Sequence, residues 1–162
     1  MDEAYELISL LTQKGKTVVT GESCTGGLLG ALLTAVPGAS KVFLGGAVTY
    51  TYDLKERLLG VKHKLLEEKG AICAEVAEQM AIGAIQRIGG DFALAVTGNA
   101  GPGADPTNPN VGEIYIACAG ENTCVARRLD LCGEREENRI TACREAIKLL
   151  LQTIDCKGWD KS

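Results

Sequence analysis

The sequence feature that most constrains the fold is the apolar run at residues 92–96, Phe-Ala-Leu-Ala-Val. A strand that is apolar at every position is buried on both of its faces, as in sheets that carry helices on both sides. Gly89-Gly90 precede the run, and a long loop rich in Gly, Pro and Asn, residues 97–111, follows it. The run therefore predicts a central strand of an α/β sheet that ends at an extended loop.

Helical and strand patterns alternate along the rest of the chain without a linker or an internal repeat. Residues 113–118 and 124–129 are typical of two strands joined through Gly120-Glu121-Asn122, a hairpin that makes the sheet mixed. We predict an α/β fold, a three-layer α/β/α sandwich with a mixed, mostly parallel sheet, in a single domain over residues 1–162. Further strands are expected at 17–20 and 45–52, and helices at 2–14, from after Gly27 to about 36, at 55–59 (capped by Asp53), 62–69, 75–88 and 134–153.

The composition argues against several classes of function. The net charge is −4 and no run of basic residues occurs, so we expect no nucleic-acid partner. No stretch reaches the roughly 18 apolar residues of a membrane span, and the acidic N-terminus lacks the positive segment of a signal peptide. We therefore expect no membrane partner and a cytoplasmic location. Seven scattered cysteines without a Cys-x-x-Cys pair, and a single histidine, indicate free thiols in a reducing compartment and no metal site.

Residues 20–27, Thr-Gly-Glu-Ser-Cys-Thr-Gly-Gly, form the first candidate site. A strand that turns through glycines into a helix leaves free backbone N–H groups, here near Gly26 and Gly27, and such groups favour an anion, typically phosphate. Ser23 and Thr25 add hydroxyl groups to the same turn. The turn predicts an anion site, and the competing interpretation is that Ser23 or Thr25 only caps the helix.

The second candidate combines Ser40 with Tyr50 and Lys55. A serine attacks only when a base removes its proton. The only histidine, His63, lies in a polar stretch between two lysines and is a poor candidate for that base. Lys55 can serve instead if burial or a neighbouring cation lowers its pKa. The alternative is that Lys55 is an exposed lysine on a short helix.

The third candidate is the glycine-rich loop that begins at Thr97 and Gly98, because ligands of α/β sheets bind at the carboxyl ends of strands. Arg135, near the start of the last helix, can donate two parallel hydrogen bonds to a phosphate or a carboxylate. The competing interpretations are a long surface loop without a ligand, and local pairing of Arg135 with Glu134 and Glu136.

Five segments of the chain form an ordered series. They are Glu22-Ser23-Cys24-Thr25-Gly26-Gly27; Pro37-Gly38-Ala39-Ser40; Gly45-Gly46-Ala47-Val48-Thr49-Tyr50 with Lys55 and Leu59-Gly60-Val61; Thr97-Gly98-Asn99-Ala100-Gly101-Pro102-Gly103; and Val111-Gly112. Their order and spacing resemble the CinA C-terminal-domain family, in its stand-alone form, over roughly residues 5–155. Five ordered motifs are far more specific than any one of them.

This resemblance implies a nicotinamide-nucleotide amidase, which hydrolyses nicotinamide mononucleotide to nicotinate mononucleotide and ammonia in pyridine nucleotide salvage, without a metal or a cofactor. It implies Ser40 as the nucleophile, Lys55 as its base and Tyr50 as a support for the lysine or the leaving ammonia. Ser23 is the alternative nucleophile, and Ser40 is preferred because it precedes the strand and helix that bring Tyr50 and Lys55. The partners implied are a small-molecule nucleotide and further copies of the chain in a homo-oligomer. The implied substrate-binding residues are Ser23, Thr25, Gly26, Gly27, Thr97, Gly98 and Arg135.

Two positions depart from the family pattern and bear on substrate preference. Asn99 stands where the family often has isoleucine, and Tyr52 adds bulk near the proposed base. Two other functions stay open. One is a non-catalytic nucleotide-binding module, such as a competence- or damage-linked regulator. The other is a thiol enzyme that uses Cys24, placed at a helix N-terminus where thiolates are favoured.

Overall fold

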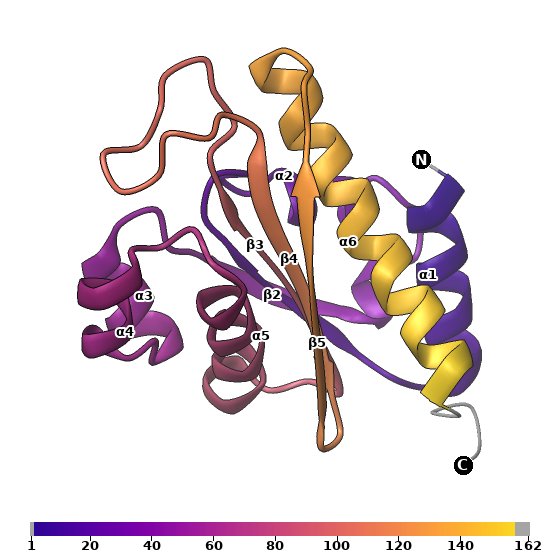
Figure 1. Ribbon diagram of the computed structural model, residues 1–162. Coiled ribbons are helices and arrows are strands. Elements are labelled where there is room, and N and C mark those ends of the chain that lie inside the picture. The colour runs from indigo at the N-terminus through magenta and orange to yellow at the C-terminus, as the bar shows by residue number, and fades with distance from the viewer. Residues whose placement is uncertain (1, 158–162) are drawn as a thin grey trace.

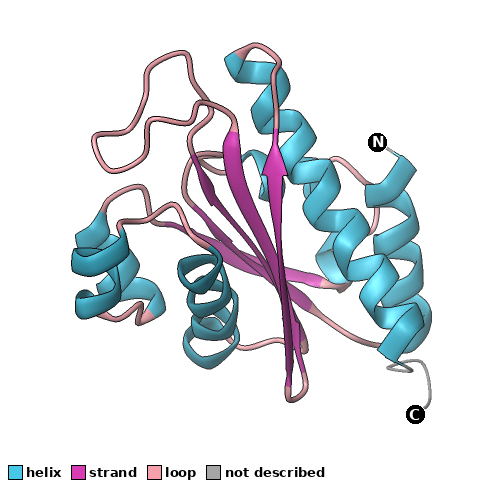
Figure 2. Cartoon of the chain, in the orientation of Figure 1, coloured by secondary structure: helices cyan, strands magenta, loops and turns pink. Residues whose placement is uncertain are grey.

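The computed structural model describes residues 2–157, which fold into three layers (Figure 1). Strands lie between two groups of helices, as Figure 2 shows by colour. The predicted α/β/α sandwich is therefore confirmed. On one side of the sheet lie α1 (Asp2–Lys14), α2 (Leu28–Thr34) and α6 (Arg135–Lys157), and on the other lie α3 (Tyr52–Leu59), α4 (His63–Lys69) and α5 (Ala74–Ile88).

The sheet has five strands in the order β2-β1-β3-β4-β5. β1 pairs in parallel with β2 and β3, while β4 pairs antiparallel with β3 and β5. Only β4 runs against the other four strands, so the predicted mixed, mostly parallel sheet is confirmed. The carboxyl ends of β1, β2 and β3 consequently meet at one edge. The strands are β1 (Val18–Glu22), β2 (Phe43–Val48), β3 (Phe92–Gly98), β4 (Glu113–Gly120) and β5 (Thr123–Asp130).

The central strand β3 is buried along its length, as its apolar run predicted. Leu94 and Val96 pack into the core beneath α1, α2 and α6, whereas Ala93 and Ala95 face the core beneath α5. The small alanines allow α5 to approach the sheet closely. At Gly83 of α5, an added Cβ would overlap the backbone oxygen of Leu59, so α5 also packs tightly against the end of α3.

Several element ends differ from those the sequence indicated. β1 continues through Glu22, so part of the expected turn belongs to the strand. β2 begins at Phe43 and ends at Val48, earlier than predicted. Thr51, not Asp53, caps α3, because the Thr51 side chain accepts a hydrogen bond from the N–H of Leu54 (3.2 Å). Because β1 ends at Glu22 and β2 ends at Val48, Ser23 and Tyr50 lie just beyond the carboxyl ends of these strands.

Within residues 2–157, none of the helices combines the length and apolar character that a membrane crossing requires. The six cysteines whose side chains are described carry free thiols. Three of these, Cys24, Cys118 and Cys143, are buried, which agrees with the predicted free thiols.

Candidate active site

A pocket of about 290 Å³ opens at the edge where the parallel strands end. Ser23 follows β1, Tyr50 follows β2, and Thr97 lies near the end of β3, and all three line the pocket. The loop after β3 and Arg135 at the start of α6 complete its wall. The topology thus brings together residues from both ends of the sequence, at the position where α/β sheets bind ligands.

Lys55 is the most unusual residue of the pocket, because it is a lysine that is only 1% exposed. Its Nζ donates hydrogen bonds to Ser23 Oγ (2.8 Å) and to the backbone oxygen of Thr49 (2.7 Å). Burial lowers the pKa of Lys55 to about 8, and the nearby Cys24 and Asp105 oppose this only in part. At pH 7 about one lysine in ten is then neutral, a far larger fraction than for a solvated lysine. Lys55 is therefore suited to accept a proton.

Ser23 is held in place by the ends of the parallel strands. Its N–H donates to the backbone oxygen of Val96 in β3 (3.0 Å). The N–H of Thr49 donates to the backbone oxygen of Glu22 (2.7 Å), which ties the end of β2 to the end of β1. Ser23 and the backbone oxygen of Thr49, which accepts a hydrogen bond from Lys55, thus lie at adjoining strand ends. The distance between them is set mainly by the backbone hydrogen bonds that join these strands.

The turn that follows β1 does not offer the free anion site that the sequence predicted. The buried carboxylate of Glu22 accepts hydrogen bonds from Thr25 Oγ1 (2.6 Å), Gly27 N (3.2 Å), Leu29 N (2.9 Å) and Gly30 N (3.1 Å). An acidic side chain of the protein itself therefore occupies the N-terminus of α2, where a phosphate was expected. The sequence prediction missed this because β1 was expected to end before Glu22.

The predicted binding residues of this turn have structural roles instead. Thr25 is fully buried, and its hydroxyl is engaged by Glu22. The N–H of Gly26 donates to the backbone oxygen of Ser23 (3.0 Å), and φ at Gly26 is 59°, a value that favours glycine. Neither Thr25, Gly26 nor Gly27 lines the pocket. Of the four predicted binding residues of this turn, only Ser23 lines the pocket.

Ser40 lies far from the lysine with which the sequence paired it. It is exposed in a short 3-10 helix, Ala39–Lys41, that precedes β2, whereas Lys55 comes after the other end of that strand. A strand of six residues spans about 20 Å, so the two residues lie toward opposite edges of the sheet. The structure does not support Ser40 as the partner of Lys55, and it places Ser23 there instead.

The other predicted residues do line the pocket. Tyr50 is exposed at its mouth, where its hydroxyl accepts a hydrogen bond from Arg135 Nη2 (3.3 Å). Arg135 Nη1 donates to the backbone oxygen of Gly101 (2.5 Å). Thr97 and Gly98 form part of the wall, and the Thr97 hydroxyl donates to the backbone oxygen of Ala71 (2.9 Å). The alternative interpretation, local pairing of Arg135 with Glu134 and Glu136, finds no support among the described contacts.

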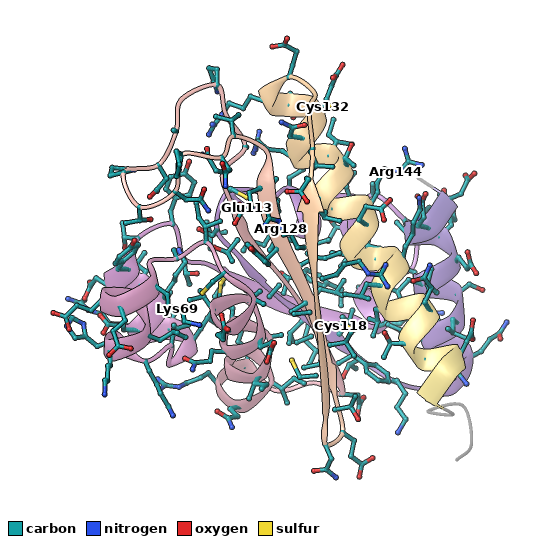
Figure 3. All side chains as sticks on the ribbon, in the orientation of Figure 1. Lys69, Glu113, Cys118, Arg128, Cys132 and Arg144 are labelled. Atoms are coloured by element: carbon teal, nitrogen blue, oxygen red, sulfur yellow. The ribbon has the colours of Figure 1, made fainter. Side chains whose placement is uncertain are left out.

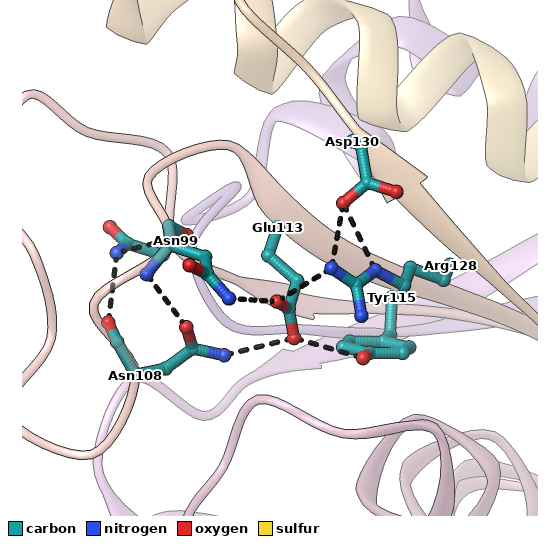
Figure 4. A network of polar contacts seen from close by, with 7 residues as sticks. Asn99, Asn108, Glu113, Tyr115, Arg128 and Asp130 are labelled. Atoms are coloured by element: carbon teal, nitrogen blue, oxygen red, sulfur yellow. Dashed lines mark hydrogen bonds and ion pairs between the residues drawn. The ribbon is translucent and has the colours of Figure 1, made fainter.

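A loop between β3 and β4 supplies pocket residues that the sequence prediction did not select, among them Asp105. Glu113 anchors this loop: its carboxylate accepts hydrogen bonds from Asn108 and Asn110 of the loop and from Tyr115, each at 2.9 Å (Figure 4). Arg128 on β5 pairs with the same carboxylate (3.0 Å), and Figure 3 shows Glu113 and Arg128 together on the strands. The Asn and Asp residues scattered through this glycine-rich loop are the signal that could have predicted this network.

Two alternative catalytic groups are less suited to the chemistry. His63 is exposed and pairs with Glu56 (2.8 Å), and it does not line the pocket. Cys24 does line the pocket, but burial raises the pKa of its thiol to about 11, which favours the unreactive protonated form. Cys24 also precedes α2 by several residues, so it does not sit at the helix N-terminus. No cluster of three or more His, Cys, Asp or Glu suited to a metal ion occurs within the described side chains.

These features define an α/β domain whose pocket, at the carboxyl edge of its parallel strands, holds a buried serine–lysine pair. The chain belongs to the CinA C-terminal domain family, which it matches over residues 2–154.

Curated relatives and solved structures agree with this assignment. The chain is 48% identical to a CinA-like protein of Geotalea uraniireducens over 90% of its own length and 35% of that protein, and 43% identical to one from Geobacter sp. over 93% and 36%. It thus spans about a third of the length of these curated relatives. The crystal structure of the competence/damage inducible protein CihA from Agrobacterium tumefaciens has a TM-score of 0.89 and 38% identity, with 93% of each chain covered. A competence-damaged protein (CinA) superfamily structure from Escherichia coli has a TM-score of 0.90 and 31% identity over 93% of this chain and 88% of that one.

Proposed function

We propose that this chain hydrolyses the carboxamide of nicotinamide mononucleotide, with Ser23 as the nucleophile and Lys55 as its base. The observation that carries the proposal is the 2.8 Å contact between Ser23 Oγ and the Nζ of a buried lysine whose pKa is lowered to about 8. Membership of the CinA family, which is broadly linked to nicotinamide-nucleotide amidase function, supports the same reaction.

The reaction divides into two steps that share one base. Neutral Lys55 takes the proton of Ser23, whose Oγ adds to the carboxamide carbon. The resulting ammonium of Lys55 returns the proton to the amide nitrogen, the C–N bond breaks, and ammonia leaves an ester on Ser23. Water then attacks that ester with Lys55 again as the base, which releases nicotinate mononucleotide and restores the serine.

The negative charge on the tetrahedral intermediate needs hydrogen-bond donors that are fixed in advance. Cys24 follows Ser23 directly and lines the pocket, and its backbone N–H donates to no other residue among the described contacts. An N–H that follows a nucleophile at a tight strand-to-helix turn is a recurring solution to this requirement. We therefore assign the oxyanion site to this part of the turn.

Arg135 is the group best placed to bind the phosphate of the nucleotide. It is exposed at the pocket mouth and is held there by Gly101 and Tyr50, so its guanidinium is oriented before the substrate arrives. A guanidinium can donate two parallel hydrogen bonds to a phosphate. This assignment replaces the turn after β1, whose N–H groups Glu22 already occupies.

The test is ammonia release from nicotinamide mononucleotide by the purified protein, with nicotinamide riboside as the control that lacks phosphate. We expect turnover of the nucleotide, and loss of at least about a thousandfold in Ser23→Ala, since the nucleophile and its base act as a unit. Ser40→Ala is the matched control and should keep full activity. A Ser23→Ala protein that keeps its activity would contradict the proposed mechanism. Binding of the nucleotide without any ammonia release would favour a non-catalytic binding module instead.

A further inference from the structure

One acidic side chain in the pocket has no role in the reaction described above. Asp105 lies in the loop between β3 and β4, is half-buried and lines the pocket. Its Oδ1 accepts hydrogen bonds from the N–H (2.8 Å) and the hydroxyl (2.6 Å) of Thr107. No hydrogen bond or ion pair to its Oδ2 occurs among the described contacts. One carboxylate oxygen therefore orients the side chain, and the other is available to a ligand.

The cationic side chains of the pocket do not pair with Asp105. Lys55 is engaged by Ser23 and Thr49, and Arg135 donates to Gly101 and Tyr50. The charge of Asp105 does reach Lys55, since it acts to raise the pKa of that lysine. The pocket thus contains a carboxylate whose negative charge is not neutralised by direct contact with a cationic side chain of the described residues.

Two aromatic rings accompany this carboxylate. Tyr50 and Tyr52 both line the pocket, and they are 57% and 38% exposed. Their rings are therefore open to a ligand rather than packed in the core. A flat cation is favoured where a carboxylate and the faces of aromatic rings surround it, because the charge interacts with both.

We propose that Asp105, together with Tyr50 and Tyr52, selects substrates whose carboxamide is carried on a positively charged aromatic ring. The inference rests on the proposed function and narrows it. Nicotinamide mononucleotide in its oxidised form has a pyridinium ring and a phosphate, so it would place its cation near Asp105 and its anion near Arg135. The reduced nucleotide has the same phosphate and a neutral ring, and it would lack the first of these interactions.

The loop is built so that Asp105 has a defined position. Asn99 is buried, and with its amide oriented to satisfy both polar groups it donates to the backbone oxygen of Gly103 (2.9 Å) and accepts from the N–H of Asp105 (3.3 Å). The backbone of Asn99 also pairs with Glu113 (3.0 Å) and Gly112 (2.7 Å), which closes the base of the loop. Asn99 is thus a positioning residue that acts through Asp105.

The test measures binding to the Ser23→Ala protein, in which turnover does not disturb the equilibrium. Dissociation constants for oxidised and reduced nicotinamide mononucleotide are determined by calorimetry, with and without Asp105→Asn. We expect the preference for the oxidised form to fall about three- to fivefold in Asp105→Asn, as for a partly exposed charge pair. A change in the shape of the loop affects both ligands alike and cancels in the ratio. Loss of Asp105 also lowers the pKa of Lys55, which weakens repulsion of the cationic ring and acts in the opposite direction, so a fall in the ratio does not come from Lys55. Asp53→Asn, an exposed acid on α3 outside the pocket, is the control and should leave the ratio unchanged.

The outcomes separate this inference from the proposed function. If both ligands bind and the ratio of their dissociation constants is the same in Asp105→Asn as with Asp105, the inference is overturned. Ammonia release by the unmodified protein would in that case still support the proposed amidase. If neither ligand binds, the inference is overturned as well, and the ammonia assay alone decides the proposed function. A reduced ratio confined to Asp105→Asn supports the assignment.

Discussion

Replacing Lys55 by methionine should abolish activity and at the same time stabilise the fold at neutral pH. The pKa of Lys55 falls from its ordinary 10.5 to about 8 on folding, mainly because the side chain is buried. Each tenfold change in an ionisation constant corresponds to about 1.4 kcal/mol, so keeping the ammonium form in the folded protein costs about 3 kcal/mol. Methionine fills similar space without a charge. It also loses two hydrogen bonds, which contribute about 1 kcal/mol each, so we expect a net gain of about 1 kcal/mol at pH 7.

The pH dependence of this gain is the sharper expectation. Between pH 8 and 10.5 the unfolded chain binds a proton at Lys55 that the folded protein has released, so folding stability rises with pH in that window. Relative to Lys55→Met, the unmodified protein should gain about 1.4 kcal/mol by pH 9 and about 2.5 kcal/mol by pH 10. The variant is therefore the more stable protein at pH 7 and the less stable one at pH 10.

The comparison between the two proteins is essential because buried thiols have the opposite effect. Burial raises the pKa values of Cys24 to about 11 and of Cys124 to about 12. The unfolded chain ionises at these thiols first, so their contribution to stability is lost as the pH rises above 9. Both proteins share this loss, and it largely cancels in their difference.

The assay is urea unfolding of both proteins at pH 7, 8, 9 and 10, followed by circular dichroism with a reducing agent present. Lys64→Met is the control for the loss of a lysine as such, since the Lys64 side chain is 84% exposed. A stability difference between the unmodified protein and Lys55→Met that stays constant from pH 7 to 10 would refute the reasoning. It would mean that folding does not lower the pKa of Lys55.

Three further expectations follow from named contacts. The kcat/KM for nicotinamide mononucleotide should rise about tenfold per pH unit up to a plateau above pH 8, because only neutral Lys55 accepts the proton; a profile that is flat from pH 6 to 9 would contradict this. Glu22→Gln should destabilise the protein by about 1–2 kcal/mol in urea unfolding, since an amide group would face N–H donors such as that of Leu29; an unchanged urea midpoint would argue against the cap. Gly83→Ala should cost about 2 kcal/mol or more, because the new Cβ overlaps the backbone oxygen of Leu59; a melting temperature equal to that of the unmodified protein would show that the two helices can separate freely.

Much of the fold could be predicted because it depends on local patterns. The apolar run at residues 92–96 lies within the central strand β3, and the hairpin after residue 112 makes the sheet mixed. The amphipathic patterns at residues 2–14 and 75–88 match α1 and α5 to within a residue. Burial on one helical face or on both faces of a strand leaves a periodic record in the sequence. The residue at which a strand ends is less clearly indicated by such patterns. The predicted ends of β1 and β2 therefore differ by two or more residues from the observed ends.

The sequence by itself determined the layers of this protein and the segments that supply the pocket. Only the tertiary structure decided which serine meets Lys55. Ser40 and Ser23 both precede Lys55 in the chain, but β2 separates Ser40 from the edge where Ser23 lies. Likewise, the turn after β1 has the composition of a phosphate site, yet the carboxylate of Glu22 folds back onto its N–H groups. The direction of a strand and the burial of a charge depend on residues far apart in the chain, and for that reason spacing alone could not determine them.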